Sequence, residues 1–168
     1  YSEIILNDVL VPKEHRLDIK ISGMELIKRV LDVSCIGLSA EILGVIMESF
    51  ELTINYLKER EQFGVKIGSF QSLQHRAAKL FSEIELCKSI VLKALQAIDK
   101  DDKNISNYAS LAKAKLCKTV KLVTNEAIQM HGGIGVTDDS NIGFYLKKAR
   151  VLQKIFGDYN YHLDKLAK

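Results

Sequence analysis

Apolar side chains recur every three or four residues along most of this sequence, which is the spacing of an amphipathic helix. The pattern predicts one helix from about residue 26 to 56, a second that begins near Ser69, and a third that ends near Met130. A shorter fourth helix and a last amphipathic piece follow. The clearest stripe belongs to the second helix: Leu73, Ala77, Leu80, Ile84, Cys87, Val91, Ala94 and Ile98.

Polar residues and glycines separate these helical segments. Ser69 is placed to cap the second helix, and Thr137 or Ser140 to cap the fourth. The single proline is Pro12, so no strong helix breaker interrupts the rest of the chain. Long amphipathic helices joined by short turns predict an all-α, antiparallel up-down four-helix bundle, with a short extra helix at the C-terminus.

The first twelve residues have a different pattern. Apolar residues alternate there before Pro12, which predicts one short strand and an exit turn. A lone strand cannot satisfy its own backbone, so we expect it to pair with a preceding β-domain in a longer protein. A chain that begins with Tyr1 fits that expectation. The domain prediction is therefore residues 1–14 for the end of a β-domain and its exit turn, and residues 15–168 for the helical domain.

Composition narrows the class of protein. The net charge of +3 is too small to indicate nucleic-acid binding. No apolar run is expected to reach membrane-spanning length, and no signal peptide is visible. The lysines of the third helix are expected to lie largely on a solvated face; they are Lys113, Lys115, Lys118 and Lys121.

The three cysteines, Cys35, Cys87 and Cys117, lie inside helical apolar patterns. Their odd number and wide spacing fit neither a disulfide framework nor a metal site. We therefore expect reduced, mostly buried thiols in an intracellular protein, and no metal.

Four short segments are more specific than this periodicity. They are Arg60-Glu61-Gln62-Phe63-Gly64, Phe70-Gln71-Ser72-Leu73-Gln74-His75, Gln129, and His131-Gly132-Gly133-Ile134-Gly135. Each alone has an ordinary explanation, such as a solvated helix end, a core phenylalanine, a surface glutamine or a glycine helix cap. In this order and at these separations, the set closely resembles the C-terminal helical domain of the acyl-CoA dehydrogenase family.

The resemblance covers nearly the whole chain and implies flavin adenine dinucleotide (FAD) as cofactor. It implies that Arg60, with its planar charged fork, faces the pyrophosphate, and that Phe63 offers a flat apolar face. The other implied contacts to the flavin of a neighbouring subunit are Gln62, Gln71, Gln129, Gly132 and Gly133. By the same resemblance, residues 2–12 match the end of the family's middle β-domain. The implied partners are an acyl-CoA substrate, an electron-transfer flavoprotein, and further subunits in a dimer of dimers.

The catalytic base is the main departure from the family pattern. The family's glutamate usually comes immediately before the glycine that Gly157 matches, as part of the substrate site, but here that position is Phe156. A minority of the family places the glutamate at the position of Ser34. Asp32 lies about 200° round the helix from Ser34 and is expected to point elsewhere. Asp158 is the nearest carboxylate, although an N-cap of the last helix is the favoured role, with His162 placed to pair with it.

Two hypotheses follow from this departure. In the first, the chain belongs to an acyl-CoA dehydrogenase subunit whose base comes from a different, catalytic large subunit. The resemblance is closest to small subunits of bacterial two-subunit enzymes, such as the small subunit of pimeloyl-CoA dehydrogenase. The second is a non-catalytic scaffold for oligomerisation, and a variant of the first keeps Asp158 as base. The expected location is the cytoplasm of a bacterium, or the mitochondrial matrix in a eukaryote.

Overall fold

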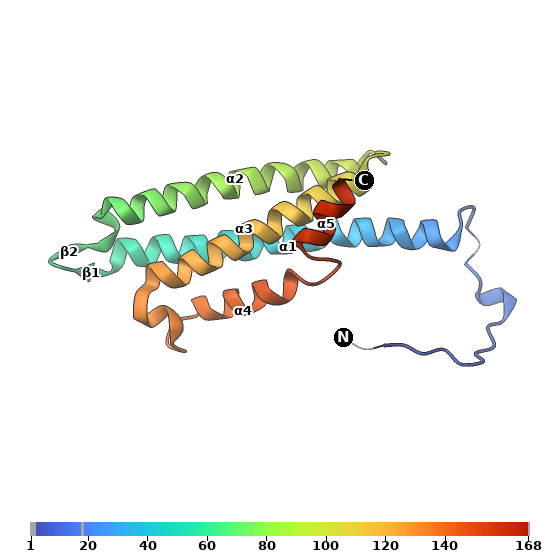
Figure 1. Ribbon diagram of the computed structural model, residues 1–168, viewed down its shortest axis with the longest axis horizontal. Helices are drawn as coiled ribbons and strands as arrows, with labels where there is room; N and C mark the ends of the chain where they lie inside the picture. Colours follow the sequence, from blue (N-terminus) through green and yellow to red (C-terminus); the bar gives the residue numbers. More distant parts are fainter. Residues whose placement is uncertain (1–2, 18, 168) are drawn as a thin grey trace.

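A computed structural model of the chain describes residues 3–17 and 19–167 (Figure 1). The described part contains five α-helices: α1 Gly23–Glu59, α2 Gln71–Asp99, α3 Ile105–His131, α4 Ile142–Leu152 and α5 Tyr159–Leu166. A two-residue hairpin, β1 Glu61–Gln62 with β2 Val65–Lys66, joins α1 to α2. Short 3-10 turns lie at Lys13–His15, Ile67–Ser69 and Gly132–Val136.

Helices α1, α2 and α3 run alternately up and down, and α4 completes the bundle beside them (Figure 1). The central helix is α3, which packs against α1, α2, α4 and α5. One large apolar cluster is shared by α1, α2, α3 and α4 and includes Ile42, Ile46, Leu80, Leu116 and Val120, all buried. Burial of such stripes stabilises the bundle by on the order of 25 cal/mol per Å² of apolar surface removed from water. The predicted all-α four-helix bundle with a short extra C-terminal helix is confirmed.

The N-termini of the helices differ in how they are capped, and the predicted caps at Ser69 and Ser140 are not the N-cap residues. A capping box begins α1, because the hydroxyl of Ser22 accepts from the N–H of Glu25 while the Glu25 carboxylate accepts from the Ser22 N–H. Ser69 does not cap α2: its hydroxyl donates to the carbonyl of Lys66, and the N-cap residue is Phe70. At α4 the hydroxyl of Ser140 accepts a long hydrogen bond of 3.4 Å from the Ile142 N–H, one residue before the N-cap.

The segment before α1 lies apart from the bundle. Residues 3–12 are exposed and form no strand in the described part of the chain, and Tyr1 and Ser2 of the predicted strand lie outside the described residues. The difference from the expected strand has a simple reason, because a strand needs a partner to complete its hydrogen bonds and the described residues offer none. Its apolar side chains, such as Ile4 and Leu6, face solvent.

Helix α1 is long and apolar enough to cross a membrane by length and composition alone. The expectation that no apolar run reaches this length is therefore wrong. The helix is nevertheless a core element of the bundle, because it packs on α2, α3 and α4 and buries Ile36, Ile42 and Ile46 against them. Its buried hydroxyls are also satisfied within the helix, as when Thr53 donates to the carbonyl of Ser49. A bundle core helix passes the same compositional test, and we interpret α1 as one.

Candidate functional site

The end of α1 places the predicted Arg60 and Gln62 on the surface. Arg60 is the C-cap residue, and its backbone N–H donates to the carbonyl of Tyr56 at 2.9 Å. The Arg60 side chain is exposed and forms no ion pair with any described residue, so its guanidinium is available to an outside anion. Gln62 is also exposed, and its side-chain amide donates to the neighbouring carbonyl of Glu61.

Phe63 occupies the tip of the hairpin in an unusual conformation. Its φ angle is +56° and that of Gly64 is +77°, as required for a two-residue type I′ turn. For a bulky residue this left-handed backbone costs about 1–3 kcal/mol. Phe63 is 91% exposed, and its ring forms an edge-to-face pair with Phe70 at 6.2 Å between centroids. Packing within the described chain therefore does not offset the strain, and the ring is displayed outward.

The remaining predicted contacts lie at the ends of α2 and α3. Gln71 is the first residue of α2 and Gln129 lies in the last turn of α3, and both side chains are exposed. Gly132 ends α3 with φ of +65°, a conformation that favours glycine. At Gly133, by contrast, an added Cβ would meet nothing within 4 Å. The chain itself therefore gives no reason for a glycine at position 133, whereas an approaching molecule would.

These four segments come from two distant parts of the sequence, residues 60–75 and 129–135, and gather at one end of the bundle (Figure 1). The end of α1 and the end of α3 are joined by the stacked rings of Tyr56 and His131. The predicted side chains do not hydrogen bond to one another within the described residues. The arrangement is a set of outward-facing groups, comprising one cation, one aromatic ring and three amides. Such a set can bind a ligand or subunit that lies against this end.

A second candidate region lies near the opposite end, where a cavity of about 630 Å³ opens between α1, α3 and α5. Phe156 and Gly157, where the motif resemblance leads us to expect the catalytic and substrate positions, form one wall of this cavity. The rest of the lining is mixed, with the apolar Leu31 and Tyr161 beside the charged Asp32 and Lys165.

Asp32 faces this cavity. Its carboxylate accepts from the ammonium of Lys165 at 3.1 Å and from the hydroxyl of Ser106 at 3.3 Å. Ser34, the alternative base position, is not part of the lining. The two side chains therefore point in different directions, as the 200° between them predicts.

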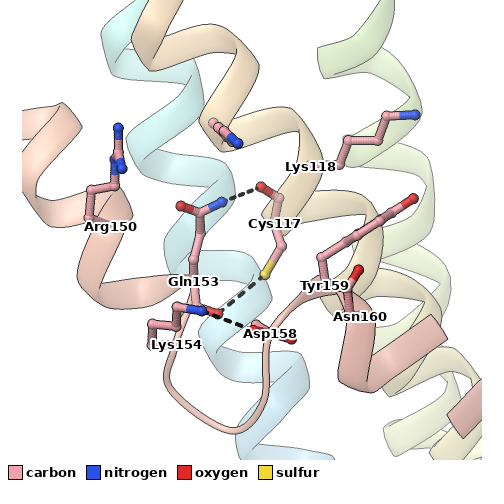
Figure 2. Close-up of a pocket in the computed structure, with 9 residues that line it drawn as sticks. Cys117, Lys118, Arg150, Gln153, Lys154, Asp158, Tyr159 and Asn160 are labelled. Carbon is pink, nitrogen blue, oxygen red and sulfur yellow. Dashed lines mark hydrogen bonds and ion pairs between the residues drawn. The ribbon is translucent and has the colours of Figure 1, made fainter. Parts of the chain in front are cut away.

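Asp158 is the N-cap residue of α5, which was the favoured prediction. Its carboxylate accepts from the backbone N–H of Tyr161 at 3.2 Å and pairs with Lys154 at 2.9 Å (Figure 2). The hydrogen bond from Lys154 and then that from Tyr161 hold the pKa of Asp158 below its usual value. A base near neutral pH needs the opposite shift, so this environment favours the capping role over catalysis.

We expected His162 to pair with the Asp158 side chain, but it bonds to a backbone carbonyl instead. Its Nε2 lies 3.0 Å from the carbonyl of Phe156, and because a carbonyl can only accept, Nε2 carries the proton. The ring is buried, and Nδ1 has no partner among the described residues. Burial is the main cause that lowers the pKa of His162. Next to it, burial raises the pKa of the Cys35 thiol to about 11, and all three cysteines are free and buried as predicted.

The prediction that the lysines of the third helix lie largely on a solvated face fails most clearly at Lys113. It was expected largely on a solvated face, but it is fully buried between α3, α4 and α5, with 0% of its surface exposed. Its ammonium reaches the carbonyls of Leu152 and Gly157, at 3.1 Å and 3.0 Å. Lys118 and Lys121 on the same helix are exposed, and Lys115 is partly exposed beside Glu83.

Comparison with known proteins decides what kind of domain this is. A family model described as "Acyl-CoA dehydrogenase, C-terminal domain" matches residues 22–168. The chain belongs to the acyl-CoA dehydrogenase family. Similar proteins include the caffeyl-CoA reductase–Etf complex subunit CarC of Acetobacterium woodii, which is 33% identical over 89% of this chain and 39% of that protein. The mitochondrial short/branched chain specific acyl-CoA dehydrogenase of Bos taurus is 30% identical over 98% of this chain and 38% of that protein.

The fold of the acyl-CoA dehydrogenase domain is equally clear from solved structures. The structure of butyryl-CoA dehydrogenase from Megasphaera elsdenii superposes with a TM-score of 0.89 at 28% identity, and covers 97% of this chain and 42% of that one. The chain thus spans about two fifths of the length of these relatives. The family resemblance stated from the motifs is confirmed.

Several polar residues of this acyl-CoA dehydrogenase domain were not found from the sequence. Asp32, Lys165 and Lys113 each look like a surface residue of an amphipathic helix when only one helix is considered. The available signal was weak: Lys113 lies between Ala112 and Ala114, and small neighbours are compatible with close helix packing. The burial of Asp32 and Lys113, and the ion pair of Lys165 with Asp32, depend on α5 folding back across α1 and α3, which one-dimensional periodicity does not reveal.

Proposed function

We propose that this chain is the C-terminal domain of a subunit of an FAD-dependent acyl-CoA dehydrogenase, in which residues 15–168 help to hold the flavin and build the oligomer. Residues 1–14 are then the end of the preceding β-domain. The proposal rests on the exposure of Phe63. This residue is 91% exposed on a strained turn, at the end of the bundle where the four motif segments gather, which we call the motif end. An exposed aromatic ring held at this energetic cost is well explained by a partner outside the chain.

The residues present at this end fit FAD. Arg60 offers an unpaired guanidinium for the pyrophosphate, and the open backbone at Gly133 lets the adenosine half come close. Gln62, Gln71 and Gln129 supply neutral hydrogen bonds from three separate segments. When bound, the flavin supplies hydride acceptance at the β carbon of the thioester. The role of this chain is to bind and orient it across a subunit boundary.

The proton-transfer half of the reaction is assigned to a different chain. Phe156 has no group that can accept a proton, and the carboxylate of Asp158 is an N-cap with a lowered pKa. We therefore place the catalytic base on a large subunit, and this chain is the small subunit of a hetero-oligomer. We propose that the acyl-CoA thioester binds beside Gly157, which lines the 630 Å³ cavity.

The electron acceptor proposed for the assembly is an electron-transfer flavoprotein. Support comes from the A. woodii relative, which is named as a subunit of a complex with Etf. The opposing hypothesis is a scaffold that has kept the fold without flavin. The exposed Arg60 and Phe63 argue against it, because a scaffold has no need of a strained aromatic turn.

The test is co-purification of the full-length protein with the chain encoded beside its gene. Visible flavin absorption from the pair, and its loss with Arg60→Gln, is the expected result. Arg29→Gln is the matched control, since it removes a cation from the other end of the same helix, where Arg29 pairs with Asp101. Absence of flavin from both the pair and the protein alone would favour the scaffold.

A further inference from the structure

The ammonium of Lys113 lies at the junction of three segments. Its Nζ is 3.1 Å from the carbonyl of Leu152, 3.3 Å from that of Gln153 and 3.0 Å from that of Gly157. The sulfur of Cys117, one turn further along α3, is 3.2 Å away. Three N–H donors thus meet a ring of acceptors, and none of the acceptors within hydrogen-bond distance in the described chain is a carboxylate.

The negative charge that balances this ammonium comes from backbone dipoles. Leu152 is the last residue of α4 and Gln153 its C-cap, so their carbonyls are among those that a helix leaves without partners. The C-terminal end of a helix also carries about half a negative charge. A buried ammonium is expensive to desolvate, and most helices end without one. Capping of α4 alone therefore does not explain why Lys113 is here.

The hydrogen bond from Lys113 to the third carbonyl, that of Gly157, explains why a buried lysine lies at this junction. Phe156 has φ of +58° and Gly157 has φ of +98°, so two successive residues lie in the left-handed region. A Cβ at Gly157 would lie 2.3 Å from the ring of Tyr161, so this segment is also tightly packed. The two carbonyls are each held by a buried donor, Phe156 by His162 Nε2 and Gly157 by Lys113 Nζ, both at 3.0 Å. Strained backbone persists only where its surroundings fix it, and these two donors do so.

We propose that Lys113 is a positioning residue, which clamps the Phe156–Gly157 segment as a wall of the cavity and so sets the shape that the acyl-CoA thioester meets. The clamp ties the wall to the end of α4 and to α3, two elements that belong to the main bundle. The link to the thioester rests on the function proposed above, whereas the clamp itself does not.

The first experiment measures the clamp without any ligand. Amide hydrogen exchange is followed in the assembled protein for peptides covering residues 153–160, in wild type, Lys113→Met and the control Lys121→Met. Methionine keeps the length and apolar stem but has no N–H, whereas Lys121 is an exposed lysine of the same helix. We expect exchange in this segment to rise about tenfold in Lys113→Met, as for loss of a hydrogen bond to a charged group, with the core of α1 unchanged.

The second experiment measures binding of a series of saturated acyl-CoA thioesters, butyryl-CoA among them, to the same assemblies by calorimetry. We expect the Kd to weaken about tenfold in Lys113→Met, while the flavin content per assembly equals that of wild type. Unchanged flavin separates the clamp from the cofactor site at the other end. If Lys113→Met does not fold, Lys113→Gln carries both measurements, because its shorter amide cannot meet three carbonyls.

The outcomes separate the two proposals. Unchanged exchange at residues 153–160 overturns the clamp, whatever the assembly binds. Faster exchange with an unchanged Kd overturns the link to the thioester. If the wild-type assembly binds neither flavin nor any thioester, the proposed function fails, and the exchange measurement still decides whether Lys113 holds this segment.

Discussion

The phenol ring of Tyr56 lies flat on the imidazole of His131, with 4.4 Å between centroids and 19° between planes. The Tyr56 hydroxyl also donates to the backbone carbonyl of His131 at 3.2 Å. Tyr56 lies one turn before Arg60, and His131 immediately precedes Gly132. This contact therefore fixes the hairpin that carries the cation and the aromatic ring relative to the glycine turn of α3. The proposed flavin contacts depend on this junction, in which His131 is buried and Tyr56 is half-buried.

Two glycines of the turn after α3 should respond differently to alanine. At Gly135 an added Cβ would lie 2.7 Å from the carbonyl of Ile128, so Gly135→Ala should destabilise the chain by about 1–3 kcal/mol through overpacking. At Gly133 the Cβ meets nothing, so Gly133→Ala should leave the free energy of unfolding within about 0.5 kcal/mol. Urea unfolding of both variants measures this difference.

Gly133→Ala also tests the proposed cofactor site. In the assembly, Gly133→Ala should lower the flavin content although the domain is as stable as wild type, because the methyl group occupies space reserved for the ligand. A Gly133→Ala assembly that retains full flavin would show that nothing approaches this backbone closely.

Replacement of Phe63 should separate stability from binding. Phe63→Asn creates an Asn-Gly pair, the preferred sequence of a type I′ turn, and should raise the free energy of unfolding by about 1 kcal/mol as the strain is relieved. The same change removes the exposed ring and should reduce flavin retention by the assembly. Thermal unfolding and flavin absorption are the two measurements. Loss of stability on this substitution would mean that the ring packs within the chain after all.

The bundle could be predicted because its helices depend on local pattern. Stripes such as Leu80, Ile84 and Cys87 recur at the helical period, and polar or glycine-containing turns mark where the chain reverses. The caps were less certain: Ser69 lies next to a short 3-10 turn and bonds back into it, which a capping rule cannot foresee. The N-terminal residues alternate like a strand, yet a strand forms only with a partner.

The two candidate regions differ in how far sequence could locate them. The motif end follows from segments at helix termini, and antiparallel helices necessarily bring alternate termini together. The cavity could not be located, because it depends on α5 crossing α1 and α3. That crossing buries Lys113 and His162 and turns Asp32 into a wall residue, and no periodicity of a single helix encodes it.

We expect Asp158 to act as the N-cap of α5 and not as the catalytic base. Asparagine caps helices about as well as aspartate, so Asp158→Asn should keep α5 folded and leave turnover of the assembly near that of wild type. Asp158→Ala removes the acceptor for the Tyr161 N–H and should lower the melting temperature. Turnover assays with flavin content measured in parallel provide the check. Should Asp158→Asn abolish turnover while flavin stays bound, Asp158 is the base and the assignment to another chain is wrong.

His162 should make the stability of the chain depend on pH on the acid side. Burial, then Lys113 and Lys165, lower its pKa in the folded state, against the opposing effects of the Phe156 carbonyl and of Asp158. The unfolded chain takes up a proton near the ordinary pKa of about 6.5, and the folded chain does so only at lower pH. Stability is therefore full above about pH 6.5 and falls as the pH drops from there to the folded-state pKa.

The measurement is the free energy of unfolding from about pH 7.5 to pH 5, taken for wild type, His162→Gln and His75→Gln. Glutamine at position 162 keeps an N–H for the carbonyl of Phe156 but cannot titrate, so the wild-type excess over His162→Gln should be constant above about pH 6.5 and shrink below it. His75 is exposed on α2, and its replacement should leave the wild-type slope intact. Parallel curves for wild type and His162→Gln across this range would mean that His162 takes up its proton equally in both states.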